Sequence, residues 1–474
     1  MEERRQFLDE QWRVLRDNGG RGLRGYASQE ASLAIRYYAF ALEDIDERQE
    51  HIGRLADALV ETGKRREAAM LLAEAAEPAG LTERQYESAA YRLLGDRMLR
   101  NGRHSDAIAE FREALRLELG NVGAILGLGV CLGLAGEYAQ AASEFERVID
   151  LPGVPTEPVA WALFNRGVAK GSLGDRQGEI ADYTAVVLLP GAPTEGIARA
   201  LANRAFAKLF LGDSQGAIAD YTAVVDLPGA PAEQVAEVLS NRGVAKRLLG
   251  DSQGAIADYT AVVDIPGAPV KVVAMALANR GIAFDAEGDS NKALSDFQSV
   301  VGMPGVSSAL RGQAMLDCGV ALMMLHRPTE AVARFEECLA LRGSAESVHG
   351  AFARLMHTHM ESGRTQDAMR LMAQLHEFEP AETPIEKCLE ARIDAITTAG
   401  KEHTPETAAL LLDAALKNDP EDIRVRMEFL APAIQYARTG DEQTLSRLPE
   451  RERDMAKQIA AVIMGKKDRV EMGH

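Results

Sequence analysis

The chain has 474 residues, more than the roughly 100–200 residues of one ordinary compact domain. Its 71 acidic residues outnumber its 53 basic residues, and the formal net charge of −18 argues against a general nucleic-acid binder, which would carry a basic face. The hydrophobic content of 46% excludes a globally disordered chain. No apolar run reaches about 18 residues, and Met1–Arg16 lacks the apolar core of a secretory signal, so we expect a cytoplasmic protein without a membrane span.

The N-terminal segment, residues 1–47, predicts a helical cap. Met1–Asn18 places Trp12 and other apolar residues near one face of a helix, and Ala27–Ile45 predicts a second helix. Gly20–Gly25 between them matches the GxGxxG pattern of dinucleotide sites, which needs a strand before it and a helix after it. A polar helix precedes it here, so we interpret these residues as a linker.

Four segments in the middle of the chain repeat without gaps, at a spacing of 38 residues. Each contains an Asn-Arg-Gly/Ala triplet, then Gly-Asp, then an aromatic residue and finally Pro-Gly. The triplets begin at Asn165, Asn203, Asn241 and Asn279, the aromatic residues are Tyr183, Tyr221, Tyr259 and Phe297, and the last prolines are Pro190, Pro228, Pro266 and Pro304. Weaker copies extend the pattern from about residue 48 to residue 445, which gives about eleven units.

Each unit predicts two helices. Val159–Leu173 and Gln177–Leu189 have apolar residues at helical spacing, and Gly174-Asp175 separates them. No alternation with a period of two is sustained, so strands are not expected. Stacking would bury the apolar faces of such short helices against neighbouring units, and the predicted fold is therefore an all-α solenoid.

This pattern resembles the tetratricopeptide repeat (TPR), a helix-turn-helix unit of about 34 residues. The resemblance covers about four fifths of the chain and rests on the small residues, glycines and aromatic residues that keep one register. It implies a right-handed superhelical solenoid of about eleven repeats in residues 48–445, with near-identical repeats in residues 155–305. Residues 446–474 then supply a C-terminal capping helix, Arg451–Met464, and a charged tail, Lys466–Glu471.

The central repeats depart from the family pattern in two ways. Their extra four residues fall in segments such as Leu227–Glu233, and we expect them to lengthen the first helix by about 6 Å, roughly one turn. We place Pro155, Pro193, Pro231 and Pro269 as the first residues of these helices, with Glu157, Glu195 and Glu233 in the first turns. In the first central repeat Glu179 replaces a small packing residue, which puts close helix packing there in doubt.

The resemblance implies a concave groove lined by the first helices. Four asparagines would face this groove: Asn165, Asn203, Asn241 and Asn279. Their side-chain amides can form hydrogen bonds with the backbone of a partner peptide. The alternative is that they form hydrogen bonds with a neighbouring helix. The other expected partner-binding residues on this face are Trp161, Phe164, Arg199, Phe206, Phe210 and Arg247. Trp, Phe and Arg are common anchors of interfaces.

An arginine in each central repeat pairs by spacing with an acidic residue 16 positions later. Units that lack the arginine lack the aspartate too, as with Leu94 and Glu110 or Cys318 and Arg334. We therefore expect structural ion pairs between the two helices of a unit. The four pairs are Arg166 with Asp182, Arg204 with Asp220, Arg242 with Asp258, and Arg280 with Asp296.

Motifs that usually carry chemistry have simpler interpretations here. Gly212–Gly216 and Gly250–Gly254 match the GxSxG nucleophile elbow, but they occupy interhelix turns, where Ser214 and Ser252 would cap the second helix. His349, His357, His359 and His376 lack metal-ligand spacing, and we expect them on the surface or in the groove. Cys131, Cys318, Cys338 and Cys388 form no CxxC pair, which argues against disulfides or zinc. We expect no catalytic residues, metal or cofactor.

The sequence thus predicts a non-catalytic adaptor that binds an extended or helical segment of a partner protein in the groove. The acidic balance favours a basic segment. Two alternatives stay open: a scaffold that self-associates into a homo-oligomer, and a sensor or regulatory subunit of a separately encoded enzyme. Neither nucleic acid nor a membrane is an expected partner.

Overall fold

The computed structural model describes residues 10–14, 33–36, 39, 45–76 and 80–466. Within these ranges all regular structure is helical and no strand occurs, which confirms the all-α prediction. Three predicted features lie wholly or mostly outside the described residues. They are the linker Gly20–Gly25, the helices expected in Met1–Asn18 and Ala27–Ile45, and the tail beyond Lys466. Trp12, which is described, donates a hydrogen bond from Nε1 to His51 Nδ1 at 2.8 Å.

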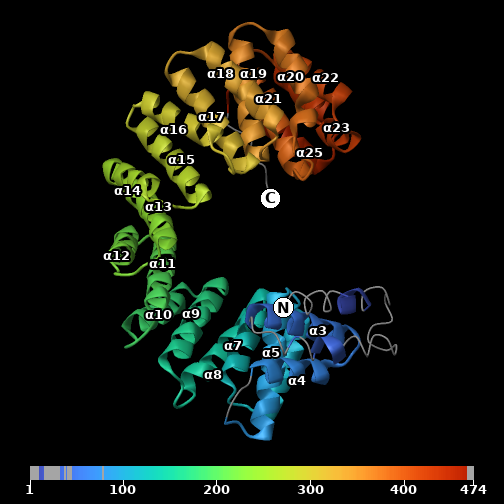
Figure 1. Cartoon of the computed structure of the whole chain (residues 1–474). Coiled ribbons are helices and arrows are strands. Elements are labelled where there is room, and N and C mark those ends of the chain that lie inside the picture. Colours follow the sequence, from blue (N-terminus) through green and yellow to red (C-terminus); the bar gives the residue numbers. More distant parts are fainter. Residues whose placement is uncertain (1–9, 15–32, 37–38, 40–44, 77–79, 467–474) are drawn as a thin grey trace. The chain divides into compact units, whose positions relative to one another are not determined.

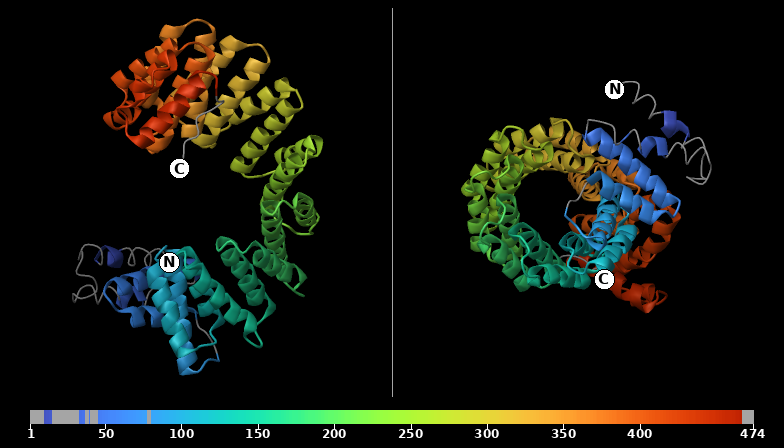
Figure 2. Two further views of the ribbon diagram at one scale, coloured as in Figure 1. Left: turned by 180° about the vertical axis from the view of Figure 1, so that it is seen from behind. Right: turned by 60° about the horizontal axis from the view of Figure 1, so that its bottom comes forward.

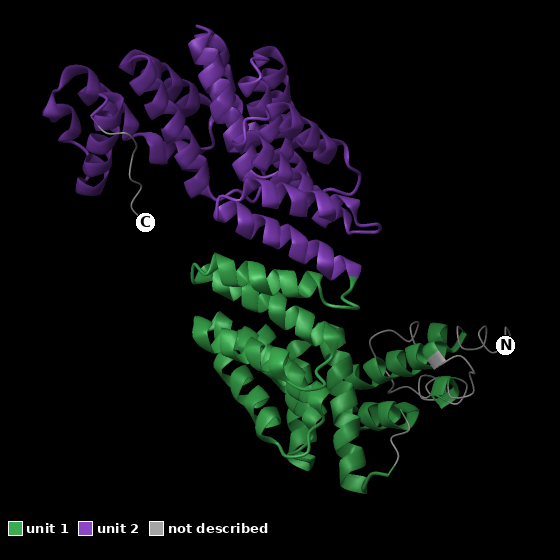
Figure 3. Cartoon of the chain, turned by 90° about the vertical axis from the view of Figure 1, so that its left-hand side faces the viewer, with its two compact units in different colours: residues 1–231 green, residues 232–474 purple. Residues whose placement is uncertain are grey.

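The chain divides into two compact units, residues 1–231 and 232–474 (Figure 3). The division falls inside the near-identical repeats, where the sequence shows no break. The first unit contains α3 (Ile45–Glu61), α4 (Arg65–Ala76), α5 (Glu83–Arg100), α6 (His104–Leu117), α7 (Val122–Leu134), α8 (Tyr138–Asp150), α9 (Thr156–Ser172), α10 (Arg176–Leu188), α11 (Thr194–Phe210) and α12 (Ser214–Val225).

The second unit begins with the other two near-identical hairpins. Its helices are α13 (Ala232–Leu248), α14 (Ser252–Asp264), α15 (Val270–Ala286), α16 (Ser290–Gly302), α17 (Ser308–Met324), α18 (Pro328–Leu341), α19 (Ala345–Glu361), α20 (Thr365–Phe378), α21 (Ile385–Glu402), α22 (Pro405–Asn418), α23 (Glu421–Met427), α24 (Leu430–Thr439) and α25 (Glu450–Ile463), with a 3₁₀ helix at Glu442–Leu445. α25 packs against α24 and α21.

Most helices that follow one another in the chain lie side by side within each unit (Figures 1 and 2). Within each unit, several first helices also contact the first helix of the next hairpin, as α9 contacts α11 and α13 contacts α15. Each unit is therefore an α-solenoid, in which a hairpin covers the apolar face of its neighbour.

The repeated aromatic residues fill the space inside each hairpin. Tyr183, Tyr221 and Tyr259 are at most 1% exposed. A Cβ atom on Gly243 would lie 2.6 Å from Cε1 of Tyr259, so the small residue of the first helix makes room for the ring on the second. The repeat pattern is thus a packing pattern, as the contacts of Gly167 with Tyr183, Gly243 with Tyr259 and Gly281 with Phe297 show in three of the central hairpins.

The Gly-Asp pairs end one helix and begin the next. Gly212 and Gly250 have φ values of +79° and +84°, a conformation that favours glycine at helix C-termini. The following aspartate is the N-cap of the second helix, because Asp213 accepts a hydrogen bond from the backbone N–H of Gly216 at 2.8 Å. The prediction that Ser214 and Ser252 cap these helices is therefore wrong, since each is the first helical residue.

The lengthened first helix of the central repeats is confirmed. α9, α11, α13 and α15 each span 17 residues, whereas α7 spans 13. Long first helices also occur outside these repeats, since α5 has 18 residues. Pro155, Pro193 and Pro269 occupy the N-cap, one residue before the predicted position, and their extended backbone there leads into the first turn.

Glu179 is accommodated by a glycine. It is only 6% exposed, and a Cβ atom on Gly171 would lie 2.6 Å from the Glu179 carboxyl carbon. Arg176 pairs with this carboxylate at 2.7 Å. Close packing in the first central hairpin therefore persists, because the missing side chain on α9 leaves space for the larger one on α10.

Candidate functional site

An aromatic cluster lies on the first helices of two neighbouring hairpins in the first unit. On α9, Trp161 and Phe164 meet edge to face with ring centroids 6.1 Å apart, and Phe164 also contacts Tyr183 at 5.5 Å. Both α9 side chains are half-buried, and Phe164 packs against the hairpin core. The core thus fixes the positions of the α9 aromatic side chains.

α11 extends this cluster with two exposed rings. Phe206 and Phe210 are four residues apart, so they share one face of the helix, and their ring centroids are 5.1 Å apart. They are 54% and 63% exposed. Large apolar side chains exposed together commonly mark an interaction surface.

Two arginines connect the rings across the helices. The Arg199 guanidinium on α11 lies 5.5 Å from the Trp161 ring centroid, and the Arg176 guanidinium on α10 lies 4.6 Å from the Phe210 centroid. Both distances suit a cation–π interaction. We name the set of Trp161, Phe164, Phe206, Phe210, Arg176 and Arg199 the aromatic patch.

The four repeated asparagines are not equivalent. Asn165 donates from Nδ2 to the carbonyl oxygen of Trp161 in its own helix at 2.9 Å. Asn203 donates to the Tyr183 hydroxyl of the preceding hairpin at 3.4 Å, which is a contact between repeats. Asn241 is exposed and Asn279 is half-buried. The four amides therefore differ in their hydrogen bonds and in their exposure.

Arg247 lies on α13, in the second unit. Its Nε atom is buried without a hydrogen-bond partner among the described residues, as is the Tyr259 hydroxyl. Burial raises the pKa of Tyr259, and the nearby Arg247 cation opposes this shift. Met275 and Ile282 on α15 are 43% and 39% exposed, so first helices of the second unit also present apolar side chains.

The four arginine–aspartate pairs are present at the predicted spacing. Arg204 donates from Nε and Nη2 to the two carboxylate oxygens of Asp220, at 2.8 and 2.7 Å. The other three pairs have the same two-bonded geometry: Arg166 with Asp182, Arg242 with Asp258, and Arg280 with Asp296. The aspartate is buried in each hairpin, at 3–6% exposure.

A lysine joins three of these pairs. Lys170, Lys208 and Lys246 contact the same aspartates at 2.7–2.9 Å. Each lies four residues after the arginine, which places both cations on one face of the first helix. The sequence could have indicated this contact, because the lysine recurs at the same position in three repeats. Phe284 replaces it in the fourth.

Glu110 occupies the position at which the central repeats have the paired aspartate. Its own hairpin has no arginine at the matching position, and Glu110 forms an ion pair with an arginine of another hairpin instead. It is 3% exposed and pairs with Arg65 of the preceding hairpin at 2.8 Å. Arg334, by contrast, pairs with Glu337 one turn later on its own helix. The first contact joins two repeats, so the spacing within one repeat could not predict it.

The four histidines between residues 349 and 376 lie in the second unit and differ in environment. His349 Nε2 lies 2.9 Å from Glu379, His359 is 8% exposed, and His357 lies 3.3 Å from both Glu361 and Glu402. The expectation of surface or groove positions is therefore wrong for His359, which is buried against the helix core. No group of three or more potential metal ligands occurs among the described residues.

Arg392 on α21 carries a buried charge in the second unit. Its guanidinium donates to both carboxylate oxygens of Asp419, at 2.6 and 2.7 Å, and to those of Glu379, at 2.8 and 3.0 Å. The side chain is completely buried. Sequence reasoning missed this network, because its partners lie on the segments that follow two different helices.

The four cysteines are free and buried, as expected for Cys318 and Cys338. Burial raises the pKa of Cys131 and Cys338 to about 11 and of Cys318 and Cys388 to about 12. These thiols are apolar packing groups rather than nucleophiles.

Among the helices that the structure describes, none combines the length and the apolar character of a membrane-spanning segment.

Comparison with known proteins matches the N-terminal hairpins to a family model. The tetratricopeptide repeat model matches residues 54–117 and 92–158. A search of curated proteins gave no match.

Several solved structures match part of this chain. MamA is 23% identical with a TM-score of 0.31, over 37% of this chain and 93% of that one. The C-terminal part of a TPR repeat-containing protein from Cytophaga hutchinsonii is 14% identical with a TM-score of 0.44, over 55% and 98%. A tetratricopeptide repeat protein from Parabacteroides merdae is 17% identical with a TM-score of 0.37, over 56% and 98%. The family match over residues 54–158 and the consecutive helical hairpins of the described chain together support a tetratricopeptide repeat protein.

Proposed function

We propose that this protein is a non-catalytic adaptor that binds an extended or helical segment of a partner protein on its first helices. The aromatic patch on α9 and α11 is the observation that carries the proposal. It combines half-exposed Phe206 and Phe210 with Trp161 and two arginines, which are the residue types enriched among interface anchors. Its exposed rings would lose contact with water on binding.

The chemistry of the patch supports binding rather than catalysis. The rings supply apolar contact area, and the arginines supply directional donors beside them. Buried carboxylates in the same hairpins are paired with arginine and lysine, as Asp182 and Asp220 are, so these acids serve the packing of helices.

The test is affinity capture from native extract, with the double variant Phe206→Ala/Phe210→Ala beside the wild type. The matched control is Leu119→Ala/Leu188→Ala, which removes two leucines that are 75% and 73% exposed outside the patch. A protein retained by the wild type and the control and lost by the patch variant is the expected result. Equal retention by all three would contradict a role for the patch.

The same experiment separates the alternatives. Sedimentation at several protein concentrations measures self-association, and dissociation of an oligomer by the patch variant would make the patch a contact between copies of the chain. An enzyme among the patch-dependent proteins would favour the regulatory-subunit alternative. A second variant, with Asn165, Asn203, Asn241 and Asn279 changed to Ala, tests whether the amides contribute, once circular dichroism shows that it is folded.

A further inference from the structure

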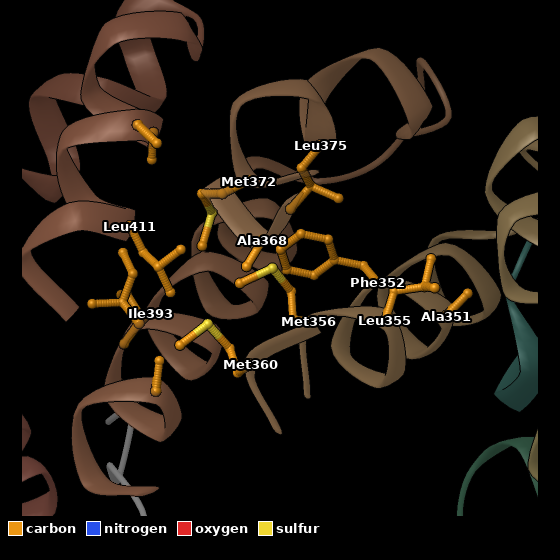
Figure 4. Packing of buried hydrophobic residues seen from close by; sticks show 14 of the residues in the cluster. Ala351, Phe352, Leu355, Met356, Met360, Ala368, Met372, Leu375, Ile393 and Leu411 are labelled. Atoms are coloured by element: carbon orange, nitrogen blue, oxygen red, sulfur yellow. The ribbon is translucent and has the colours of Figure 1, made fainter. Parts of the chain in front are cut away.

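The second unit contains a cavity that the aromatic patch does not include. It lies between α19 and α21, which contact one another as first helices of neighbouring hairpins, and its volume is about 180 Å³. Phe352, Met356 and Met360 line it from α19 and are 1%, 4% and 8% exposed. Figure 4 shows Met356 and Met360 between the Phe352 ring and Ile393 of α21.

The size of this cavity suits one side chain. An apolar cavity of about 150 Å³ in another protein holds a benzene molecule, whereas pockets for drug-sized ligands measure about 300–1,000 Å³. Small residues of α21, Ala391, Ala395 and Ala399, form the opposite wall and keep the space open. The walls are therefore suited to the aliphatic or aromatic part of a single inserted group.

The charged groups that line the cavity are acidic. Asp394 and Glu402 line it from α21, together with three histidines, His349, His357 and His403, and no lysine or arginine of the described chain is among the lining residues. Glu402 lies 3.3 Å from His357, whereas no ion pair joins Asp394 to a basic side chain in the residues that the structure describes. Loss of hydration raises the pKa of the Asp394 carboxyl, and Glu390 on the same helix adds like-charge repulsion.

We propose that this cavity binds a lysine or arginine side chain from a partner segment, with its methylene groups on Met356 and Met360 and its cation beside Asp394. The inference rests on the proposed function, since it names the chemistry of the partner. Long basic side chains bury their stems on apolar surface while the charged end stays near water. Asp394 is exposed at the edge of the cavity, and a neutral apolar side chain would cover its carboxylate without providing a counter-charge. The net charge of −18 favours the same partner chemistry.

The experiment titrates the full chain, with labelled methionine methyl groups, with three small probes observed by NMR. The probes are N-acetyl-arginine N-methylamide, N-acetyl-lysine N-methylamide and the uncharged citrulline analogue. Met356→Leu and Met360→Leu assign the two reporting signals. We expect both signals to move with one or both cationic probes and to remain still with the citrulline analogue, and the two cationic arms distinguish arginine from lysine.

Asp394→Asn should weaken the cationic probe by about tenfold, the effect of losing one charge-assisted hydrogen bond. Glu390→Gln is the matched control, because it removes the same charge from the same helix outside the cavity lining and should change affinity much less. Circular dichroism of both variants checks folding. An equal response to the citrulline analogue, equal affinity of Asp394→Asn and wild type, or no response to any probe would overturn the inference.

The two proposals fail in different experiments. A captured protein that depends on Phe206 and Phe210, together with silent methionine signals, contradicts the cavity assignment and leaves the adaptor function intact. A clear probe response with no patch-dependent partner contradicts the adaptor function as proposed.

Discussion

Arg242 on α13 donates two hydrogen bonds to the carboxylate of Asp258 on α14, from Nε at 2.9 Å and from Nη2 at 2.7 Å. Asp258 is 4% exposed, and Lys246 contacts the same carboxylate at 2.9 Å. The pair joins the two helices of one hairpin, and the same geometry recurs in three other hairpins. Its structural importance follows from the cost of leaving a buried carboxylate without its main partner.

Arg242→Ala should lower the unfolding midpoint of the protein. The loss is expected on the order of 2–4 kcal/mol, because Asp258 stays buried and retains only the lysine. Chemical denaturation followed by circular dichroism measures it. Arg327→Ala is the control, since Arg327 and Glu330 form an exposed pair, and such pairs contribute about 0–1 kcal/mol. An unchanged midpoint for Arg242→Ala would refute the structural role of the pair.

Asp213→Ala and Ser214→Ala should differ in stability although they are adjacent. Asp213 accepts the hydrogen bond from the Gly216 N–H, and loss of such an N-cap costs about 0.5–2 kcal/mol. Ser214 is the first helical residue of α12 and caps nothing, so its replacement should have little effect. Denaturant melts of the two variants give the comparison. A larger loss for Ser214→Ala would reverse the assignment of the cap.

Acid should destabilise the second unit through Glu379. Burial opposes ionisation of this carboxyl, but hydrogen bonds from His349 and Arg392 outweigh it and lower the pKa of Glu379 to about 2. Because the folded-state pKa lies below the ordinary value of 4.5, the stabilisation is complete above that pH and is lost as the pH falls toward 2. The shift corresponds to on the order of 3 kcal/mol.

Glu379→Gln should therefore flatten the dependence of stability on pH between about 5 and 2. Glu377→Gln changes an exposed residue of α20 two positions before Glu379, and as the control it should leave the slope unchanged. Denaturant midpoints measured across this pH range for both variants supply the test. Identical slopes in Glu379→Gln and wild type would show that Glu379 carries no such linkage.

The four thiols should be protected from reagents in the folded protein. All are buried, and burial raises the pKa of each to about 11 or 12, so little thiolate forms at pH 8. A colorimetric thiol assay should detect no fast reaction in buffer and four equivalents in denaturant. Rapid labelling of any cysteine in the native state would contradict this burial. Mass spectrometry of the labelled peptide identifies the residue.

Sequence alone determined the features that repeat. The 38-residue spacing, the helix pairs, the fit of Tyr259 against Gly243 and the pairing of Arg242 with Asp258 follow from contacts inside one hairpin, which recur at a fixed separation in the chain. Because the pattern occurs four times, the copies can be compared with one another, and the recurrence of a pairing in all of them argues against a coincidence of spacing. The lysine that joins Asp258 recurs in the same way and was predictable on the same grounds.

Tertiary structure decided the features that occur once. The buried network of Arg392 with Glu379 and Asp419, the contact of Arg199 with Trp161 and the cavity between α19 and α21 arise where neighbouring hairpins meet. Their residues are separated by distances that no repeat reproduces, so periodicity gives no signal for them. The physical reason is that a repeat fixes the packing within a hairpin, whereas the functional surface depends on non-repeating side chains that stacking brings together.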